Sequence, residues 1–376
     1  MNILPESLKI LISTKWTFIK PKKKNILVFD EMSIKFIQFL FPKKNYEILN
    51  ALSKSINVYI LFKTFIKSGV INFSDNYKKN FIELVSPKIV ITAIDNNPVF
   101  YKLKNIYNKP NYISIQNGMR KDTFYKECKE YINKTGQKLK ADHIFLFGVN
   151  EKKRFSKIID SNFHCIGNLV NNHYPIRYKN IKKKINSIMY ISQYKISIHE
   201  NPNSPLNTFE EDKRIFNQLV KFCKKNKINL SFAANDRSNK PGLSLESYYR
   251  KNLINDKWIY HRQGNKLKTY SNLNKQQMVV FGYSTLGYEA LAKGLKCVSC
   301  YKHFPIIGSN VKYVKSGSFW TSSKKYSDLE KTLNRVIKLS SKQWKKIAGK
   351  YSKEILDYDP NNIEIKKILK RILLKK

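Results

Sequence analysis

The chain has 376 residues, 42% of them hydrophobic and 13% aromatic, and its 71 Lys and Arg against 27 Asp and Glu give a formal net charge of +44. This length exceeds one compact core of ordinary size and suits two domains. The aromatic content excludes an intrinsically disordered chain, and no apolar run reaches the length of a bilayer-spanning helix.

The positive charge has two explanations. It can attract an anionic partner such as nucleic acid, a lipid surface or a sugar nucleotide, or it can reflect codon bias, because the excess is mostly Lys beside abundant Asn and Ile. The charge is spread along the whole chain, whereas nucleic-acid binders tend to cluster it. We therefore expect no specific nucleic-acid partner, and a diffuse positive surface favours an anionic membrane face.

The N-terminal stretch "MNILPESLKILISTKWTFIKPKKK" lacks the order of a signal peptide. Its mixture of apolar residues and lysines fits an interfacial anchor, or a helix that packs on its own domain. Five cysteines at irregular spacing exclude a disulfide framework and indicate a reducing, cytoplasmic setting. Cys297 and Cys300 form a CxxC within an apolar run, so we expect strand residues there and no metal site.

Short apolar runs alternate with helical patterns in the first part of the chain. The predicted strands are 24–31, 56–62, 87–97, 110–118, 141–148 and 163–168. The predicted helices are 45–55, 75–86, 98–108 and 150–159. Such alternation predicts a parallel sheet with helices on both faces.

Residues 169–186 are polar, basic and aperiodic, and we predict a connection between domains there. The alternation then resumes. The predicted strands are 187–194, 228–236, 257–261, 277–282 and 296–300, and the predicted helices are 209–227, 244–253, one that begins at Ser284 and Thr285, 326–339 and 341–358. The pattern predicts an α/β chain with two Rossmann-like domains, 1–175 and 176–376, facing a central cleft; alternatively, the C-terminal helices pack back on the first domain.

The stretch "FGYSTLGYEALAKG" predicts a strand, a glycine, a polar pair and a helix. Backbone N–H groups at such a helix start can bind a phosphate. Gly282 allows close approach, Ser284 and Thr285 can donate to phosphate oxygens, and Glu289, about one turn on, can accept from ribose hydroxyls. The alternative is a helix with an ordinary serine or threonine cap and no ligand.

Further polar residues follow other predicted strands of the second domain. Gln193 follows the strand that opens it, and His303 follows its last core strand. In parallel sheets ligands bind outside the carboxyl ends of the strands, so both are candidate donor contacts. A loop histidine such as His303 can equally be structural.

The stretch "ISIQNGMR" leads from a predicted strand into a glycine turn. Gln116 and Asn117 can bond sugar hydroxyls, Gly118 allows a sharp turn, and Arg120 can meet a carboxylate or phosphate. These residues are candidate acceptor contacts. Asn-Gly is also a common turn dipeptide, so a plain turn is the alternative.

Two strand ends of the first domain carry carboxylates, Asp30 in "LVFDE" and Asp95 in "ITAIDNN". Either can act as a general base that removes a proton from an acceptor hydroxyl, and we favour Asp95. The alternative is that each carboxylate caps the following helix.

Several stretches together resemble the surface-carbohydrate (lipopolysaccharide or O-antigen) biosynthesis proteins of bacteria. They are "ILVFDE", "TAIDNN", "SIQNGMR", "FLFGVNEKKRF", "YISQY" and "FGYSTLGYEALAKG". The resemblance implies a GT-B-type glycosyltransferase whose second domain holds the donor nucleotide at Ser284, Thr285 and Glu289 and whose first domain serves the acceptor. It also implies similarity to capsule transferases that use sugar nucleotides, CMP-activated ulosonic acids among them, without a bound metal or cofactor.

We therefore predict a cytoplasmic glycosyltransferase, peripheral on the inner face of the cell membrane. It would move a sugar from a nucleotide-sugar donor to a glycan or lipid-linked glycan, with an anionic membrane surface as a further partner. Two alternatives stay open. One is a sugar-nucleotide epimerase of the same architecture, and the other is a non-catalytic basic protein that binds nucleic acid.

Overall fold

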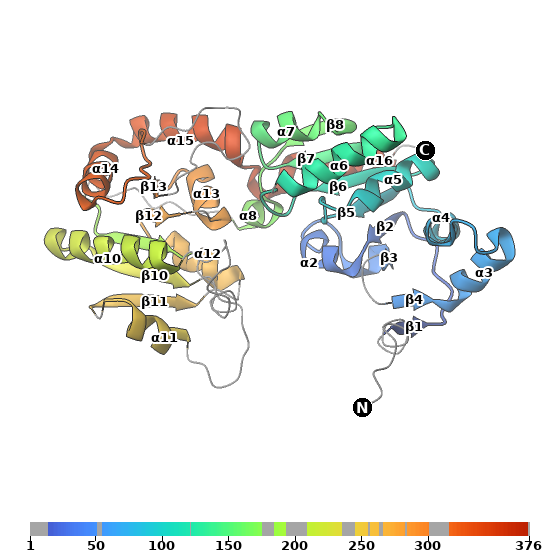
Figure 1. Cartoon of the computed structure of the whole chain (residues 1–376), viewed down its shortest axis with the longest axis horizontal. Helices are drawn as coiled ribbons and strands as arrows, with labels where there is room; N and C mark the ends of the chain where they lie inside the picture. The colour runs from blue at the N-terminus through green and yellow to red at the C-terminus, as the bar shows by residue number, and fades with distance from the viewer. Residues whose placement is uncertain are drawn as a thin grey trace. The chain divides into compact units, whose positions relative to one another are not determined.

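The computed structural model describes residues 14–50, 55–120, 122–174, 184–192, 209–234, 245–254, 256–262, 266–282, 284–300 and 316–374. The chain divides into two compact units (Figure 1). The first is Met1–His173 together with Asp359–Lys376, and the second is Tyr174–Tyr358. The chain thus leaves the first unit after His173 and returns to it after Tyr358.

The first unit is built on a parallel sheet. Its described strands, in spatial order, are β3 (Tyr46–Leu49), β2 (Ile26–Phe29), β5 (Ile89–Thr92), β6 (Asn111–Ile115), β7 (Leu139–Leu146) and β8 (Ile159–Cys165). All of these neighbours pair in parallel. β2 and β5 are apolar and wholly buried, as expected for strands covered on both faces.

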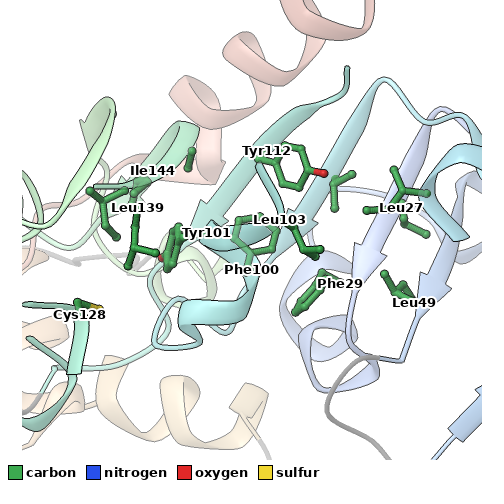
Figure 2. Close-up of a cluster of buried hydrophobic side chains, with 14 of the residues drawn as sticks. Leu27, Phe29, Leu49, Phe100, Tyr101, Leu103, Tyr112, Cys128, Leu139 and Ile144 are labelled. Carbon is green, nitrogen blue, oxygen red and sulfur yellow. The ribbon is translucent and has the colours of Figure 1, made fainter. Parts of the chain in front are cut away.

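Helices cover both faces of this sheet. Side chains alternate between the faces of a strand, so Leu27 and Phe29 of β2 point to one layer and Ile26 and Val28 to the other. The first layer holds α4 (Phe73–Val85), α5 (Pro98–Ile106), α6 (Asp122–Thr135) and α7 (Val149–Phe155). Figure 2 shows part of this core, where Phe100 and Leu103 of α5 face Phe29 and Leu27.

The second layer of the first unit comes from distant parts of the chain. It holds α2 (Ile34–Ile37), α8 (Leu169–His173) and the C-terminal α16 (Ile363–Leu374). α16 places Ile365 and Leu369 against the sheet, and both are buried. A short 3-10 helix, η3 (Pro360–Asn362), leads into it, and Asn362 donates to the carbonyl of Leu169 at 3.0 Å.

Two predicted elements of the first unit are wrong. The stretch 45–55 was predicted as a helix. Instead, it holds the last residue of the 3-10 helix η2 (Lys43–Asn45), then β3, and it ends at the first residue of β4 (Ser55–Asn57). The stretch 56–62 was predicted as a strand, but beyond β4 it belongs to the helix α3 (Val58–Ser68). β4 pairs in parallel with β1 (Lys15–Thr17). Short apolar runs do not separate a strand from a helix by periodicity.

The second unit holds another parallel sheet. Its described strands, in spatial order, are β11 (Trp258–Arg262), β10 (Asn229–Ala234), β9 (Ser187–Ile191), β12 (Met278–Phe281) and β13 (Lys296–Ser299). The accompanying described helices are α10 (Phe209–Asn226), α11 (Leu245–Asn252), α12 (Lys266–Asn274), α13 (Thr285–Ala292), α14 (Tyr326–Lys338) and α15 (Ser341–Ile355). The structure therefore confirms the predicted α/β class with two sets of parallel strands.

Aromatic packing marks the core of the second unit. The rings of Phe216 on α10 and Phe232 on β10 lie edge to face, 4.9 Å between their centres. Trp344 of α15 is fully buried, and its indole N–H donates to the carbonyl of Gly294 at 2.9 Å. That contact secures α15 on the turn between α13 and β13.

Both cysteines of the CxxC are buried in the second unit. Cys297 lies within β13 and Cys300 directly follows it. Burial raises the pKa of the Cys297 thiol and raises that of Cys300 to about 12. Both side chains therefore stay protonated at neutral pH and serve as small apolar residues.

Among the helices that the structure describes, none combines the length and the apolar character needed to cross a membrane.

Candidate active site

The order of strands in the second sheet indicates a candidate ligand site. From β9 the chain builds outward through β10 to β11, and it then returns to place β12 on the other side of β9. In sheets of this kind ligands bind outside the carboxyl ends of the two strands at which the order reverses. Here these strands are β9, followed by Ser192, and β12, followed by Gly282.

The helix α13 starts directly beyond β12. Ser284 occupies its N-cap position with an extended backbone, φ −132° and ψ 127°. Among the described residues, no side chain caps this helix end, and its first turn holds no acidic residue. A Cβ placed on Gly282 would meet no described atom within 4 Å. The amide groups at the start of α13 thus have the arrangement that suits an anion.

Close packing fixes the direction of α13. Gly287 lies against the ring of Phe281, and a Cβ at Gly287 would come within 2.2 Å of that ring. Only glycine fits there, so the first turn of the helix rests directly on the last residue of β12. Gly294, with φ 82°, follows the helix and permits the turn into β13.

Glu289 belongs to a buried cluster that the sequence did not indicate. Its carboxylate is 5% exposed and accepts from the hydroxyl of Tyr270 at 2.7 Å. The Tyr270 ring stacks on that of Tyr174, with 5.1 Å between centres. Lys293 donates to the carbonyl of Tyr174 and lies 4.7 Å from the Tyr270 ring centre. Burial lowers the pKa of Lys293 to about 8, although Glu289 opposes the shift.

The predicted ribose contact of Glu289 stays a prediction. The structure gives this carboxylate a partner in Tyr270 and a place within the packing of α13. The two other predicted donor contacts, Gln193 and His303, lie outside the described residues. Ser192, at the end of β9, is buried and donates to Asp212 of α10 at 2.5 Å.

The first sheet has its own point of reversal. From β2 the chain first adds β3 on one side and later β5 on the other. The ends of β2 and β5 are joined through Ser33, whose Oγ lies 3.3 Å from the Thr92 hydroxyl and accepts from the Ala93 N–H at 2.9 Å. Asp30 and Asp95, the two candidate bases, follow these two strands. Both carboxylates are buried.

Asp30 sits in an unusual backbone conformation. Its φ is 77° and its ψ is 136°, outside the regions that L-residues ordinarily occupy. The carboxylate accepts from the N–H of Met32 at 3.0 Å and so caps the short 3-10 helix η1 (Glu31–Ser33). Backbone strain of this kind concentrates at functional sites, because the surrounding structure must hold it in place.

Asp95 is paired with Arg120, which comes from the turn after β6. Arg120 donates to both carboxylate oxygens, with 2.6 Å between its Nε and Oδ2, and also to the side-chain oxygen of Asn117 at 2.6 Å. The Asn117 N–H donates to Asp95 at 3.1 Å, and its side chain donates to the Ala93 carbonyl. In the structure the Arg120 guanidinium thus pairs with Asp95 of the same unit, and its predicted acceptor contact stays a prediction.

Gln116 is likewise used within the fold. Its side-chain oxygen accepts from the Phe147 N–H at 2.8 Å, and its amide donates to the Gly118 carbonyl and to Glu151, each at 3.0 Å. Tyr125 also donates to Glu151, at 2.9 Å. Burial raises the pKa of the Glu151 carboxyl, which Arg154 and Tyr125 partly counteract. These contacts favour a role for Gln116 in shaping the turn, and its acceptor contact stays a prediction.

Sequence reasoning missed several polar residues of these networks, among them Glu151, Tyr125, Arg154 and Tyr270. Arg154 lies 3.9 Å above the Tyr125 ring and donates to Asp122 at 2.6 Å. Each of the four belongs to a helix, where a polar residue usually faces water. The only sequence signal for Glu151 was its place in "FLFGVNEKKRF", directly after a strand. In the part of the chain described, no three His, Cys, Asp or Glu side chains cluster as metal ligands.

Solved structures share this architecture. A protein described as "putative UDP-N-acetylglucosamine 2-epimerase" from Listeria monocytogenes is 12% identical, over 93% of this chain and 96% of that one, with a TM-score of 0.52. Sucrose-phosphate synthase from Thermosynechococcus elongatus is 10% identical over 93% and 99%, with a TM-score of 0.52. The wall teichoic acid polymerase TagF is 13% identical over 94% and 90%, with a TM-score of 0.50.

These likenesses show the fold, which is the GT-B type that glycosyltransferases and sugar-nucleotide epimerases share. The model of a protein family described as "putative O-antigen biosynthesis protein" matches residues 113–373, more than half of the chain. The chain belongs to this family. The matched range includes Arg120 and Glu289 and begins after Asp30 and Asp95. A search of curated proteins finds no match.

Proposed function

We propose that the protein is a glycosyltransferase that moves a sugar from a nucleotide-sugar donor to a growing cell-surface polysaccharide or lipopolysaccharide. Membership of the O-antigen biosynthesis family and the GT-B fold support this class of reaction. The observation that carries the proposal is the start of α13, which no described side chain caps and which lies at the reversal point of the second sheet.

The donor phosphate would bind at this helix start. The amide N–H groups and the helix dipole favour negative charge there, and the hydroxyls of Ser284 and Thr285 can donate to phosphate oxygens. The same groups would stabilise the charge that develops on the departing nucleotide phosphate. The proposal needs no metal ion for that purpose. CMP-activated ulosonic acids are among the candidate donors.

The acceptor hydroxyl would lose its proton to a carboxylate of the first unit. Both carboxylate oxygens of Asp95 accept hydrogen bonds from Arg120, and one also accepts from the Asn117 N–H. This arrangement suits a residue that positions the turn at Asn117. We assign the role of base to Asp30, because its strained backbone holds a carboxylate at the reversal point of the first sheet. The acceptor would be a glycan or a lipid-linked glycan at the cytoplasmic face of the membrane.

Transfer can be tested directly with the purified protein. We would incubate it with a panel of UDP-, GDP- and CMP-sugars, with and without lipopolysaccharide that lacks its O-antigen. We expect one nucleotide sugar to release its nucleotide only when the acceptor is present, with the sugar found on the acceptor. Failure of every donor to react under both conditions would contradict the proposal.

An epimerase is the second candidate, because the Listeria protein is as similar in structure to this chain as sucrose-phosphate synthase is, each with a TM-score of 0.52. An epimerase would isomerise its nucleotide sugar, or release the free sugar, with no acceptor added. If the protein converts a nucleotide sugar in the same assay without an acceptor, the result would favour an epimerase over a transferase.

A further inference from the structure

The helix α3 exposes large apolar side chains. Phe62 is 64% exposed, Phe65 60% and Ile66 81%. These positions recur at the spacing of three and four residues that places side chains on one face of a helix. Phe18 and Ile19, which follow β1, are exposed to a similar degree. Contiguous exposed apolar residues of this kind mark an interaction site on a folded protein.

The local fold holds these residues together on one surface. β1 pairs with β4, which leads straight into α3. Asn57 donates to the carbonyl of Ile19 at 2.8 Å and accepts from the N–H of Ile60 at 3.1 Å, so it joins the two segments. A hollow of about 540 Å³ lies among Phe18, Phe62 and Ile66 with their neighbours Val58, Tyr59, Lys63 and Lys67. We call the exposed part of this region the α3 surface: Phe18, Ile19, Phe62, Phe65 and Ile66.

The opposite face of α3 already packs on its own unit. Ile60 and Thr64 are fully buried, and the Thr64 hydroxyl accepts from the side chain of Asn80 on α4 at 3.0 Å. The exposed aromatic residues of α3 are therefore not needed for packing within the first unit, because the other face of the helix provides that packing. A helix that is apolar on both faces needs a second apolar environment.

Lysines lie beside the α3 surface, and Lys63 and Lys67 line its hollow. Residues 14–25 hold five lysines and residues 55–71 hold two, and neither stretch contains Asp or Glu. Lys20 lies over the ring of Tyr59, 5.6 Å from its centre, and Lys67 lies 3.7 Å from Glu83 of α4. The surface thus combines apolar and aromatic side chains with cationic groups, which is the composition of an interfacial membrane-binding element.

We propose that the α3 surface docks on an anionic lipid bilayer, with Phe62, Phe65 and Ile66 inserted at the level of the headgroups. Aromatic side chains are favoured at that depth, and each lysine near an anionic membrane adds to the attraction. A second copy of this chain fits the surface less well, because the lysines of both copies would meet. This inference goes beyond the proposed transfer reaction and does not depend on it.

The chain carries its own probe for this contact. Trp16 of β1 is 40% exposed, whereas Trp258, Trp320 and Trp344 are buried. We would add vesicles of phosphatidylcholine with about one-third phosphatidylglycerol to the full-length protein and record tryptophan emission and co-sedimentation. We expect binding with a blue shift of the emission, and loss of that shift in Trp16→Phe. No binding to these vesicles would overturn the proposal.

Variants identify the surface that binds. Phe62→Ser combined with Ile66→Ser should weaken vesicle binding at least about tenfold, with an unchanged melting temperature because both side chains are exposed. Ile259→Ser with Leu267→Ser is the matched control, since these apolar residues are exposed in the second unit. It should bind as the unaltered protein does. Equal binding by both double variants, or a change from dimer to monomer in the first, would contradict the assignment.

Discussion

Asp95 and Arg120 form a buried ion pair that organises the turn after β6. Asp95 is fully buried and the side chain of Arg120 is 10% exposed, so each charge depends on the other for compensation. The pair also fixes Asn117, which is bonded to both partners. Whatever contacts the acceptor, the shape of this turn depends on the pair.

Isosteric substitutions separate the two candidate carboxylates. Asp95→Asn should lower the free energy of unfolding by about 3 kcal/mol, because Arg120 is left buried without a counter-charge. Asp30→Asn should change stability by less than about 1 kcal/mol, since asparagine caps as well as aspartate and tolerates a positive φ. If Asp30 is the base, its substitution should still slow transfer at least about 100-fold.

Thermal unfolding and the transfer assay measure both effects. Full activity in Asp30→Asn would exclude Asp30 as the base. An Asp95→Asn protein that is as stable as the unaltered one and yet inactive would return that role to Asp95.

The sequence located the strand-end residues better than their partners. Asp30, Asp95, Gln116 and Ser284 all follow the strands that were predicted to precede them. Their positions could be predicted because an apolar run marks the end of a strand. The side chains that contact them could not be predicted. Glu151, for example, lies on α7, and its contact with Gln116 depends on tertiary packing.

At the scale of an element, the contact between α13 and β12 controls the candidate phosphate site. Gly287→Ala would place a methyl group within 2.2 Å of the Phe281 ring. We expect a loss of about 2 kcal/mol in stability, as for other overpacked positions, together with weaker nucleotide binding because the helix start must shift.

Gly349→Ala is the matched control for that substitution. Gly349 lies inside α15, and a Cβ there would meet no described atom within 4 Å. Alanine at this position should raise stability by about 0.5–1 kcal/mol, because glycine is a poor helix former. Chemical denaturation compares the two variants, and a Gly287→Ala protein as stable as Gly349→Ala would contradict the close packing of α13.

The wrong prediction at α3 has a physical reason. The stretch "INVYILF" reads as a buried strand if every apolar residue is taken to face a core. In the structure α3 buries Ile60 and Thr64 and exposes Phe62. We attribute the apolar residues of the outer face to the proposed membrane contact. Periodicity alone does not distinguish such a contact from burial in a core.

For the whole molecule, two parallel sheets could be predicted, because strands and helices alternate along the sequence of each unit. The sequence left open whether the C-terminal helices pack back on the first domain. The predicted helices 326–339 and 341–358 belong to the second unit, whereas α16, which was not predicted, belongs to the first. The contacts of Ile365 and Leu369 settle its place.

The start of α13 is the proposed binding site for the phosphate of a nucleotide sugar. Calorimetric binding of the donor to Ser284→Asp tests this binding, because a carboxylate there would repel a phosphate, and aspartate is a favourable residue at an N-cap position. Ser340→Asp is the control, since Ser340 caps α15 by accepting from the Gln343 N–H. We predict that Ser284→Asp keeps its stability and binds the donor at least about tenfold more weakly, whereas Ser340→Asp binds normally. Equal affinity in both variants would show that the phosphate binds elsewhere.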